Sequence, residues 1–244
     1  MKYLRKTLPY FLLLSWVILA HSQIEVNDTQ EILTIDTLIM RTKPVHPIEK
    51  REASTDKSCI DLGPYYNFAL SEEIHGKPEN TISIPVGISE YAGVKFDSRG
   101  VIQLASNVSL KNSHIEYPRE ITGIEVNHHA DSLCFLHSSA WASETGTDVV
   151  NIVVNYENGQ KQIITIKNQI DVEDWWFHPA NSVIPPNTQV AWEGTNKRVE
   201  ELGLSLKLFL YTWVNPFPEH KIVSIDLISS MNDTGYMLFG LSCL

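Results

Sequence analysis

The sequence predicts an all-β fold in which antiparallel sheets form a β-sandwich or jelly roll. Short apolar stretches recur along the chain between clusters of turn-forming residues, which is the pattern of many short strands. The two clearest stretches, residues 149–166 and 202–211, place apolar side chains at every second position, as in a strand with one buried face. Helical periodicity is weak, whereas a parallel sheet would need long helical crossovers between its strands.

The expected strands follow one another from residue 81 to the end of the chain. Besides the two clearest stretches, they cover residues 81–85, 94–97, 101–104, 121–127, 132–137, 190–192, 222–229 and 237–243. Turn-rich pieces such as Pro185-Pro186-Asn187 separate them. Strands this short at such spacing favour a sandwich.

The two clearest stretches are a hairpin over residues 149–166 and a strand over residues 202–211. In the hairpin, Asn158-Gly159 can adopt the positive φ angles of a tight type I′ turn. In the strand, leucines occupy alternate positions: Leu202, Leu204, Leu206, Leu208 and Leu210. A period of two places all five on the core face, whereas a helix would spread them around its circumference.

The N-terminus has the pattern of a secretory signal peptide. Three basic residues precede a mostly apolar stretch, and Ala20-His21-Ser22 provides small residues for cleavage. We therefore expect residues 1–22 to be a signal peptide and the protein to be secreted or periplasmic. The alternative is a membrane anchor, but the apolar stretch is shorter than the roughly 20 residues that a spanning helix needs. After cleavage we expect no membrane span.

The rest of the chain divides into a tail and a domain. Residues 23–58 are expected to be an N-terminal tail and linker, with one strand over 31–40 and a polar, solvated, mobile stretch over 49–58. Residues 59–244 are expected to be the β-sandwich domain. The formal net charge is −10, so repulsion from phosphate backbones argues against nucleic acid as a partner.

The three cysteines, Cys59, Cys134 and Cys243, leave two interpretations open. A Cys59–Cys243 disulfide would join the two ends of the expected domain, and export permits disulfides. Alternatively, all three are small buried hydrophobic residues, which the apolar surroundings of Cys134 favour.

A segment rich in tryptophan and carboxylates, residues 171–179, is the densest group of chemically useful side chains. An exposed indole gives a flat apolar face on which a sugar ring can stack, and nearby polar groups can bond its hydroxyls. The ligand-binding candidates are Trp176, His178, Trp192, Glu193 and Asn196. The competing interpretation is that these tryptophans, and Trp175 with them, pack in the core.

Three carboxylates in the same segment, Asp171, Glu173 and Asp174, are candidate calcium ligands, because calcium takes several oxygen ligands. Ordinary solvated charges are the competing interpretation, since no EF-hand spacing is present. No serine-nucleophile, phosphate-loop or dinucleotide motif occurs in the sequence. We therefore expect no catalytic residues and no other cofactor.

Several stretches together resemble uncharacterised secreted bacterial β-sandwich modules of galactose-binding-like type, which are often found beside glycoside hydrolases. They include Gly93-Val94-Lys95-Phe96-Asp97-Ser98-Arg99-Gly100-Val101-Ile102-Gln103-Leu104, Leu133-Cys134-Phe135-Leu136-His137, Asp174-Trp175-Trp176 and Ala191-Trp192-Glu193-Gly194. The resemblance covers residues 59–244 and implies a jelly roll whose end loops are open to ligands.

Three functions remain in order of preference. The first is an exported, non-catalytic module that binds a polysaccharide or other glycan. The second is a structural or protein-interaction β-sandwich of the cell envelope, with a protein partner. The third is a glycoside hydrolase-like enzyme, which would need two carboxylates about 5 to 10 Å apart across a cleft.

The leucine pattern gives a stability prediction. Truncation of a core-facing leucine removes buried apolar contacts and leaves a cavity, so Leu206→Ala should lower the free energy of unfolding by about 2–5 kcal/mol. Denaturant melts of parent and variant measure the difference. A loss below about 0.5 kcal/mol, the range of ordinary surface substitutions, would show that the strand assignment is wrong.

Overall fold

The computed structural model describes residues 39–113 and 115–244. The expected signal peptide, residues 1–22, and residues 23–38 of the expected tail lie outside the described residues. Residues Met40–Leu244 form one compact unit. Within the described ranges, no helix has the length and apolar character that crossing a membrane requires. Antiparallel strands dominate this part of the chain, which confirms the all-β class.

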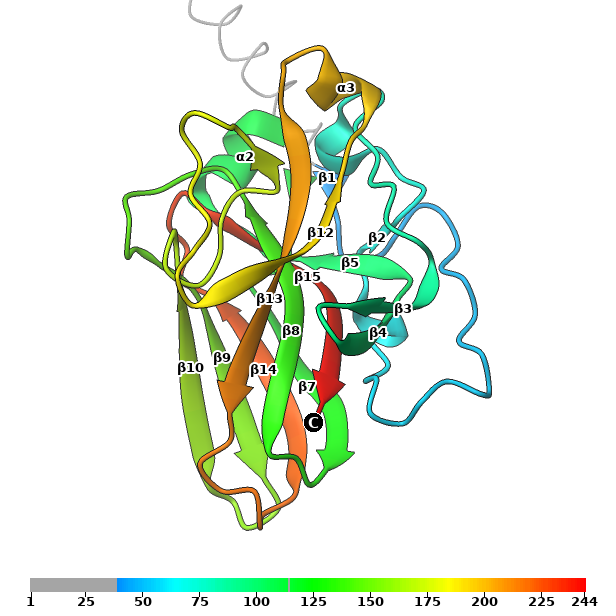
Figure 1. The fold of residues 1–244 in the computed structure, drawn as a ribbon, viewed down its shortest axis with the longest axis vertical. Helices are drawn as coiled ribbons and strands as arrows, with labels where there is room; N and C mark the ends of the chain where they lie inside the picture. The colour runs from blue at the N-terminus through cyan, green and yellow to red at the C-terminus, as the bar shows by residue number, and fades with distance from the viewer. Residues whose placement is uncertain (1–38, 114) are drawn as a thin grey trace, which may run out of the picture. The chain divides into compact units, whose positions relative to one another are not determined.

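The smaller of the two main sheets has four antiparallel strands (Figure 1). Their order is β10 (Lys161–Lys167), β9 (Asp148–Tyr156), β14 (Ile222–Ser229) and β7 (Glu120–His128). Alternate side chains of β9 are buried, including Val150, Ile152 and Val154. The opposite face is open to solvent, where Ile163 of β10 is 65% exposed. This confirms the predicted hairpin strands with their one buried face.

The turn of this hairpin differs from the expected type. Gly159 has a φ of 83°, whereas Asn158 is not among the residues with positive φ. The Gly159 N–H donates to the Tyr156 carbonyl at 3.0 Å, and the Tyr156 N–H donates to the Gln160 carbonyl at 3.0 Å. A type I′ turn needs two positive φ angles, so this loop is instead a three-residue turn with glycine in the left-handed position.

The larger sheet has seven strands. Six follow the order β11 (Trp176–Phe177), β13 (Ser205–Val214), β8 (Ser132–Ala140), β15 (Gly235–Cys243), β5 (Gly100–Gln103) and β2 (Phe68–Ala69), and β12 (Thr188–Gly194) pairs with β13. The centre of this sheet is buried on both faces, because every residue of β15 and all but the first of β8 are buried.

Two hydrophobic cores therefore lie on the two faces of the larger sheet. The inner core lies between the sheets and joins Ile152 and Ile225 of the smaller sheet to Phe135 and Leu241 of the larger one. The outer core lies on the other face and includes Leu136, Leu206 and Phe239. Alternation along each strand explains this division, since successive side chains point to opposite faces.

Short elements and irregular segments cover the outer core. They are the hairpin of β3 (Gly87–Tyr91) and β4 (Val94–Ser98), the 3-10 turn η2 (Ile74–Gly76), the helices α2 (Asn107–Ser113) and α3 (Lys197–Glu200), and the two-residue strands β1 (Ile39–Met40) and β6 (Ile115–Glu116). The other 3-10 turn, η1 (Gly63–Tyr65), packs Tyr65 against the inner core instead. Helix α2 begins with a reciprocal cap, in which Ser106 and Ser109 each accept the other's backbone N–H at 3.0 Å.

Two strand predictions need correction. Residues 81–85 are not a strand, although Ile82 and Ile84 are buried in the outer core, so their apolar pattern reflects packing without a ladder. Leu206, Leu208 and Leu210 lie buried on one face as predicted. Leu202, however, is 50% exposed because the chain only enters β13 at Ser205.

The segment from Arg41 to Ser58 has no regular structure, as expected for a linker, but it is not simply solvated. Arg41 pairs with buried Glu72 at 2.5 Å. The same Glu72 carboxylate accepts the backbone N–H of Val45 at 2.8 Å and of His46 at 3.1 Å. These contacts attach the segment to the domain, and the compact unit includes it.

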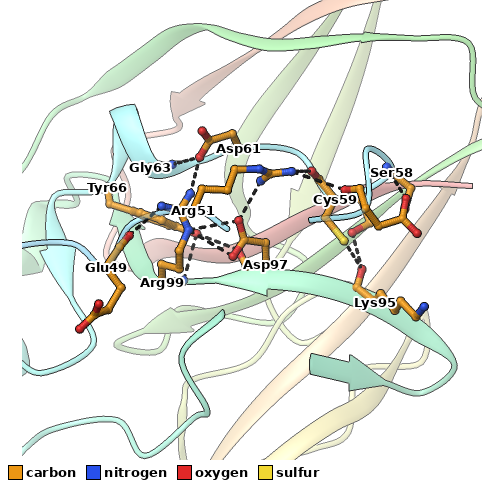
Figure 2. Close-up of polar contacts among 12 residues, drawn as sticks. Glu49, Arg51, Ser58, Cys59, Asp61, Gly63, Tyr66, Lys95, Asp97 and Arg99 are labelled. Atoms are coloured by element: carbon orange, nitrogen blue, oxygen red, sulfur yellow. Dashed lines mark hydrogen bonds and ion pairs between the residues drawn. The ribbon is translucent and has the colours of Figure 1, made fainter. Parts of the chain in front are cut away.

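A second charged cluster attaches the same segment further along (Figure 2). Asp97, at 2% side-chain exposure, accepts from Arg51 at 2.8 Å and from Arg99 at 3.1 Å. Arg99 also donates to Asp61 and to the Glu49 carbonyl, while Arg51 donates to the Cys59 carbonyl. One buried carboxylate therefore connects two guanidinium groups, which is a charge-assisted arrangement.

All three cysteines lie in the described residues and are buried and free, so the Cys59–Cys243 disulfide is not formed. Strand geometry gives the reason. Cys59 is the bridge partner of Ser242, and both Cys59 and Ser242 contact the Lys95 carbonyl. Cys243 is the next residue, so its side chain points to the opposite face, into the inner core.

The buried cluster predicts a large effect of removing Asp97. Asp97→Ala would leave two guanidinium groups without their shared carboxylate, and breaking a buried ion pair costs about 3–5 kcal/mol. Denaturant melts should show a loss of that size. Asp131→Ala, at an exposed position, is the matched control and should change stability by less than about 0.5 kcal/mol. Equal effects of the two substitutions would contradict the anchoring role.

Candidate functional site

A pocket of about 180 Å³ lies beside the outer core, where irregular segments cover the larger sheet. Its lining comes from η2 and the residues after it, from α2, from the end of β8 and from the segment leading into β11. The lining residues are His75, Lys77, Asn112, Ala140, Trp141, Asp174, Trp175 and Trp176. The pocket thus joins part of the predicted tryptophan segment to residues distant in sequence.

Two lining residues have strained backbones and contact each other. His75 has a φ of 61° and Trp141 a φ of 65°. Bulky residues such as tryptophan rarely adopt such values, whereas histidine adopts them more readily. The rings of His75 and Trp141 stack with centroids 4.5 Å apart. Backbone strain of this kind costs about 1–3 kcal/mol per residue and is concentrated at functional sites. Five other described non-glycine residues, all outside the pocket, also have positive φ. The stacked pair of aromatic rings inside a pocket, together with this backbone conformation, therefore marks the functional candidate.

His75 is buried and neutral. Its Nε2 lies 3.0 Å from Oε1 of Gln103, so Nε2 carries the proton and Nδ1 is left as an acceptor. Burial lowers the pKa of His75 from 6.5 to about 3, because a charged imidazole would lose its hydration. At physiological pH this side chain therefore adds a polar, uncharged group to the pocket.

Asp174 is the carboxylate of the pocket. Its Oδ1 accepts the Trp176 N–H at 2.8 Å, and its Oδ2 accepts the Trp141 N–H at 2.9 Å. Burial raises the pKa of Asp174 to about 7, and the charge of Glu173 adds to that effect, whereas Lys77 opposes it. Each oxygen keeps a second lone pair, so the carboxylate can also accept from a ligand hydroxyl.

The adjacent tryptophans, Trp175 and Trp176, have different environments. Trp175 is 1% exposed and belongs to the outer core. Trp176 is half-buried, and the Lys77 ammonium lies 5.3 Å from the centroid of its ring. The Trp176 indole N–H donates to Oδ1 of Asn80 at 3.2 Å. Trp176 therefore offers part of its ring to solvent while its nitrogen is held in place.

Asn80 positions this side of the pocket. It is fully buried and donates from its side chain to the Ile74 carbonyl at 2.9 Å, which closes the loop that carries His75. Its Oδ1 also accepts from Asn196 at 3.3 Å. One amide thus connects the η2 loop, Trp176 and the start of α3.

The remaining predicted ligand-binding residues do not line this pocket. Asn196 caps α3 by accepting the Val199 N–H at 2.9 Å. Glu193 pairs with Lys207 at 2.6 Å, and the Trp192 ring lies over Gly194, where a Cβ would be 2.2 Å from it. His178 is exposed, and its ring accepts the Ala180 N–H at 3.1 Å. Only Trp176 of the predicted set therefore reaches the pocket.

The three candidate calcium ligands are hydrogen-bonded to their own surroundings. Asp171 accepts the Lys167 N–H and the Asn187 side chain, both at 2.8 Å. Glu173 accepts the Asp174 N–H at 2.9 Å and the Val183 N–H at 3.2 Å. Among the described residues, no group of three or more His, Cys, Asp or Glu side chains is placed to hold a metal ion. A calcium site here stays a prediction without support from this geometry.

A larger hollow of about 400 Å³ lies beside the Asp97 cluster. Most of its lining residues are charged, and they include Asp97 and Arg99. The Arg99 guanidinium already donates to Asp97, Asp61 and the Glu49 carbonyl, so most of its donors are used within the fold. This hollow therefore has weaker support as a ligand site than the tryptophan pocket.

Sequence reasoning missed Trp141, His75, Lys77 and Asn112. Each stands alone in its stretch of sequence, without a motif or spacing that relates it to residues 174–176. In the comparisons with known proteins, the chain matches no protein-family model and no curated protein.

The burial of His75 predicts a pH dependence of stability. An unfolded histidine takes up a proton near 6.5, whereas folded His75 does so only near 3. Between these values the unfolded state binds more protons, so the free energy of unfolding falls as the pH falls. Asp174 acts in the opposite direction, because the folded state holds its proton from about 7 downward.

Replacement of His75 separates its contribution to the pH dependence from that of Asp174. Asparagine tolerates the positive φ at this position. When the pH falls from about 7 to about 4.5, the decrease in the free energy of unfolding should be smaller in His75→Asn than in the parent, by about 2 kcal/mol. Denaturant melts at both pH values measure this difference. His178→Asn, at an exposed position, is the control and should behave as the parent. Equal losses in parent and His75 variant would contradict the buried, neutral state.

Proposed function

We propose that this protein is an exported, non-catalytic carbohydrate-binding module, and that its ligand occupies the pocket between Trp141, Trp176 and Asp174. The observation that carries the proposal is a pocket that joins two half-buried indoles, Trp141 and Trp176, to the carboxylate of Asp174. Partly open indole rings suit the apolar face of a sugar. Asp174, Asn112 and neutral His75 supply hydrogen-bonding groups for its hydroxyls.

The carboxylates favour binding over hydrolysis. Glycosidases use two carboxyl groups that flank the scissile bond. Among the described residues that line the pocket, Asp174 is the single carboxylate. The neighbouring Glu173 is buried, and its oxygens accept from the backbone of Asp174 and Val183. A hydrolase therefore ranks below a binding module.

A structural or protein-interaction role is the second candidate. The burial of Trp175 and the hydrogen bond from Trp176 to Asn80 favour it, because both indoles then stabilise the loops of the outer layer. In that case the tryptophans would serve packing alone, and a protein partner would bind elsewhere. Sugar binding is preferred because two half-buried indoles, Trp141 and Trp176, meet a carboxylate in one pocket.

The finer fold that accompanies this proposal is a jelly roll of the galactose-binding-like type. Strands β7, β9 and β14 belong to the smaller sheet and β8, β13 and β15 to the larger one. The chain thus crosses between sheets at successive strands, from β7 through β9 and again from β13 through β15. Such crossings build Greek-key and jelly-roll sandwiches. Secreted or periplasmic location is proposed with it, from the signal-peptide pattern.

Replacement of Trp141 tests the proposal. Binding of the protein to a panel of soluble and insoluble polysaccharides should be detected, and Trp141→Ala should weaken it at least about tenfold. Trp213→Ala is the matched control, because Trp213 is also half-buried but packs against the inner core. Circular dichroism and melts of both variants establish that they fold. Binding to no polysaccharide would favour the structural role, and equal loss in both variants would exclude this pocket.

A further inference from the structure

We propose that the pocket takes one terminal ring of an uncharged glycan and does not bind the interior of a polysaccharide chain. This inference rests on the proposed carbohydrate function and specifies its ligand. It is carried by the size of the pocket, by the arrangement of its walls and by its charge.

The small volume of the pocket favours a ligand of one sugar ring. Its volume is about 180 Å³, below the roughly 300 Å³ at which pockets for drug-sized ligands begin. Its lining comes from four separate segments, represented by His75, Asn112, Trp141 and Trp176. Further rings of a bound chain would therefore lie outside these walls, in solvent, and would add little to the affinity.

Two of the walls are fixed rather than adaptable. Asp174 accepts the backbone N–H groups of both Trp141 and Trp176, so one carboxylate holds the two backbone segments that carry the indoles. On the opposite side, Asn80 closes the η2 loop that carries His75 and holds the Trp176 nitrogen. A pre-formed pocket binds without paying for the ordering of loops, and it cannot easily widen to admit a chain.

The charges of the pocket favour a ligand without charge. The described lining contains one ammonium group, Lys77, and one carboxylate, Asp174, whose pKa of about 7 leaves it partly protonated at neutral pH, while the buried His75 is neutral. The net charge of the pocket is therefore small. The chain as a whole has a formal net charge of −10, which repels polyanions such as uronate or sulfated polysaccharides. Hydroxyl groups, which both donate and accept, can satisfy the carboxylate and the Asn112 amide together.

The test is a length series measured by calorimetry with the full protein. Gluco-, xylo-, manno- and galacto-oligosaccharides are compared from the monosaccharide to the hexasaccharide, beside the corresponding galacturonate series. We expect the affinity per chain in one neutral series to change by less than about twofold beyond the disaccharide. Binding of that series should be lost in Trp141→Ala and retained in Trp213→Ala.

The outcomes separate this inference from the function on which it rests. An affinity that rises about tenfold or more from disaccharide to hexasaccharide, with loss in Trp141→Ala, would overturn the terminal-ring inference and leave carbohydrate binding intact. Preference for the galacturonate series would overturn the inference that the ligand is uncharged. Binding to no saccharide in any series would overturn both the inference and the proposed function.

Discussion

The two-sided burial of the larger sheet is the constraint on which the rest of the structure depends. Strand β15 is buried at every position, so its side chains fill one core on each face. The smaller sheet covers only the inner face. The outer face must be covered by something else, because burial of apolar area is the main favourable contribution to folding. Irregular segments and short elements perform that role here.

An irregular layer must satisfy its backbone polar groups without a continuous ladder. In this protein a few buried polar side chains each serve several groups. Glu72 holds Arg41 and the N–H groups of Val45 and His46, and Asp97 holds Arg51 and Arg99. The stability of the outer layer is therefore concentrated at a small number of positions.

The candidate site arises from the same layer. Asp174 and Asn80 fix the segments that carry Trp141, Trp176 and His75, and these segments retain two strained residues. Strain persists only where surrounding contacts over-determine a conformation. A rigid pocket with aromatic walls, one carboxylate and little net charge is a consequence of that support, and it is the physical basis of the proposed sugar binding.

The sequence by itself determined the all-β class and most of the strands, since alternation depends only on neighbouring positions. The hairpin over residues 149–166 and the buried faces of Leu206, Leu208 and Leu210 follow from it. Alternation could not separate a paired strand from a buried irregular segment, so residues 81–85 were misassigned. The cluster of tryptophans and carboxylates over residues 171–179 predicted Trp176 as a site residue, but nothing in the sequence predicted Trp141 or His75. Only the tertiary structure decided the site, because its residues meet through loops that carry no periodic signal and are fixed by buried hydrogen bonds between distant segments.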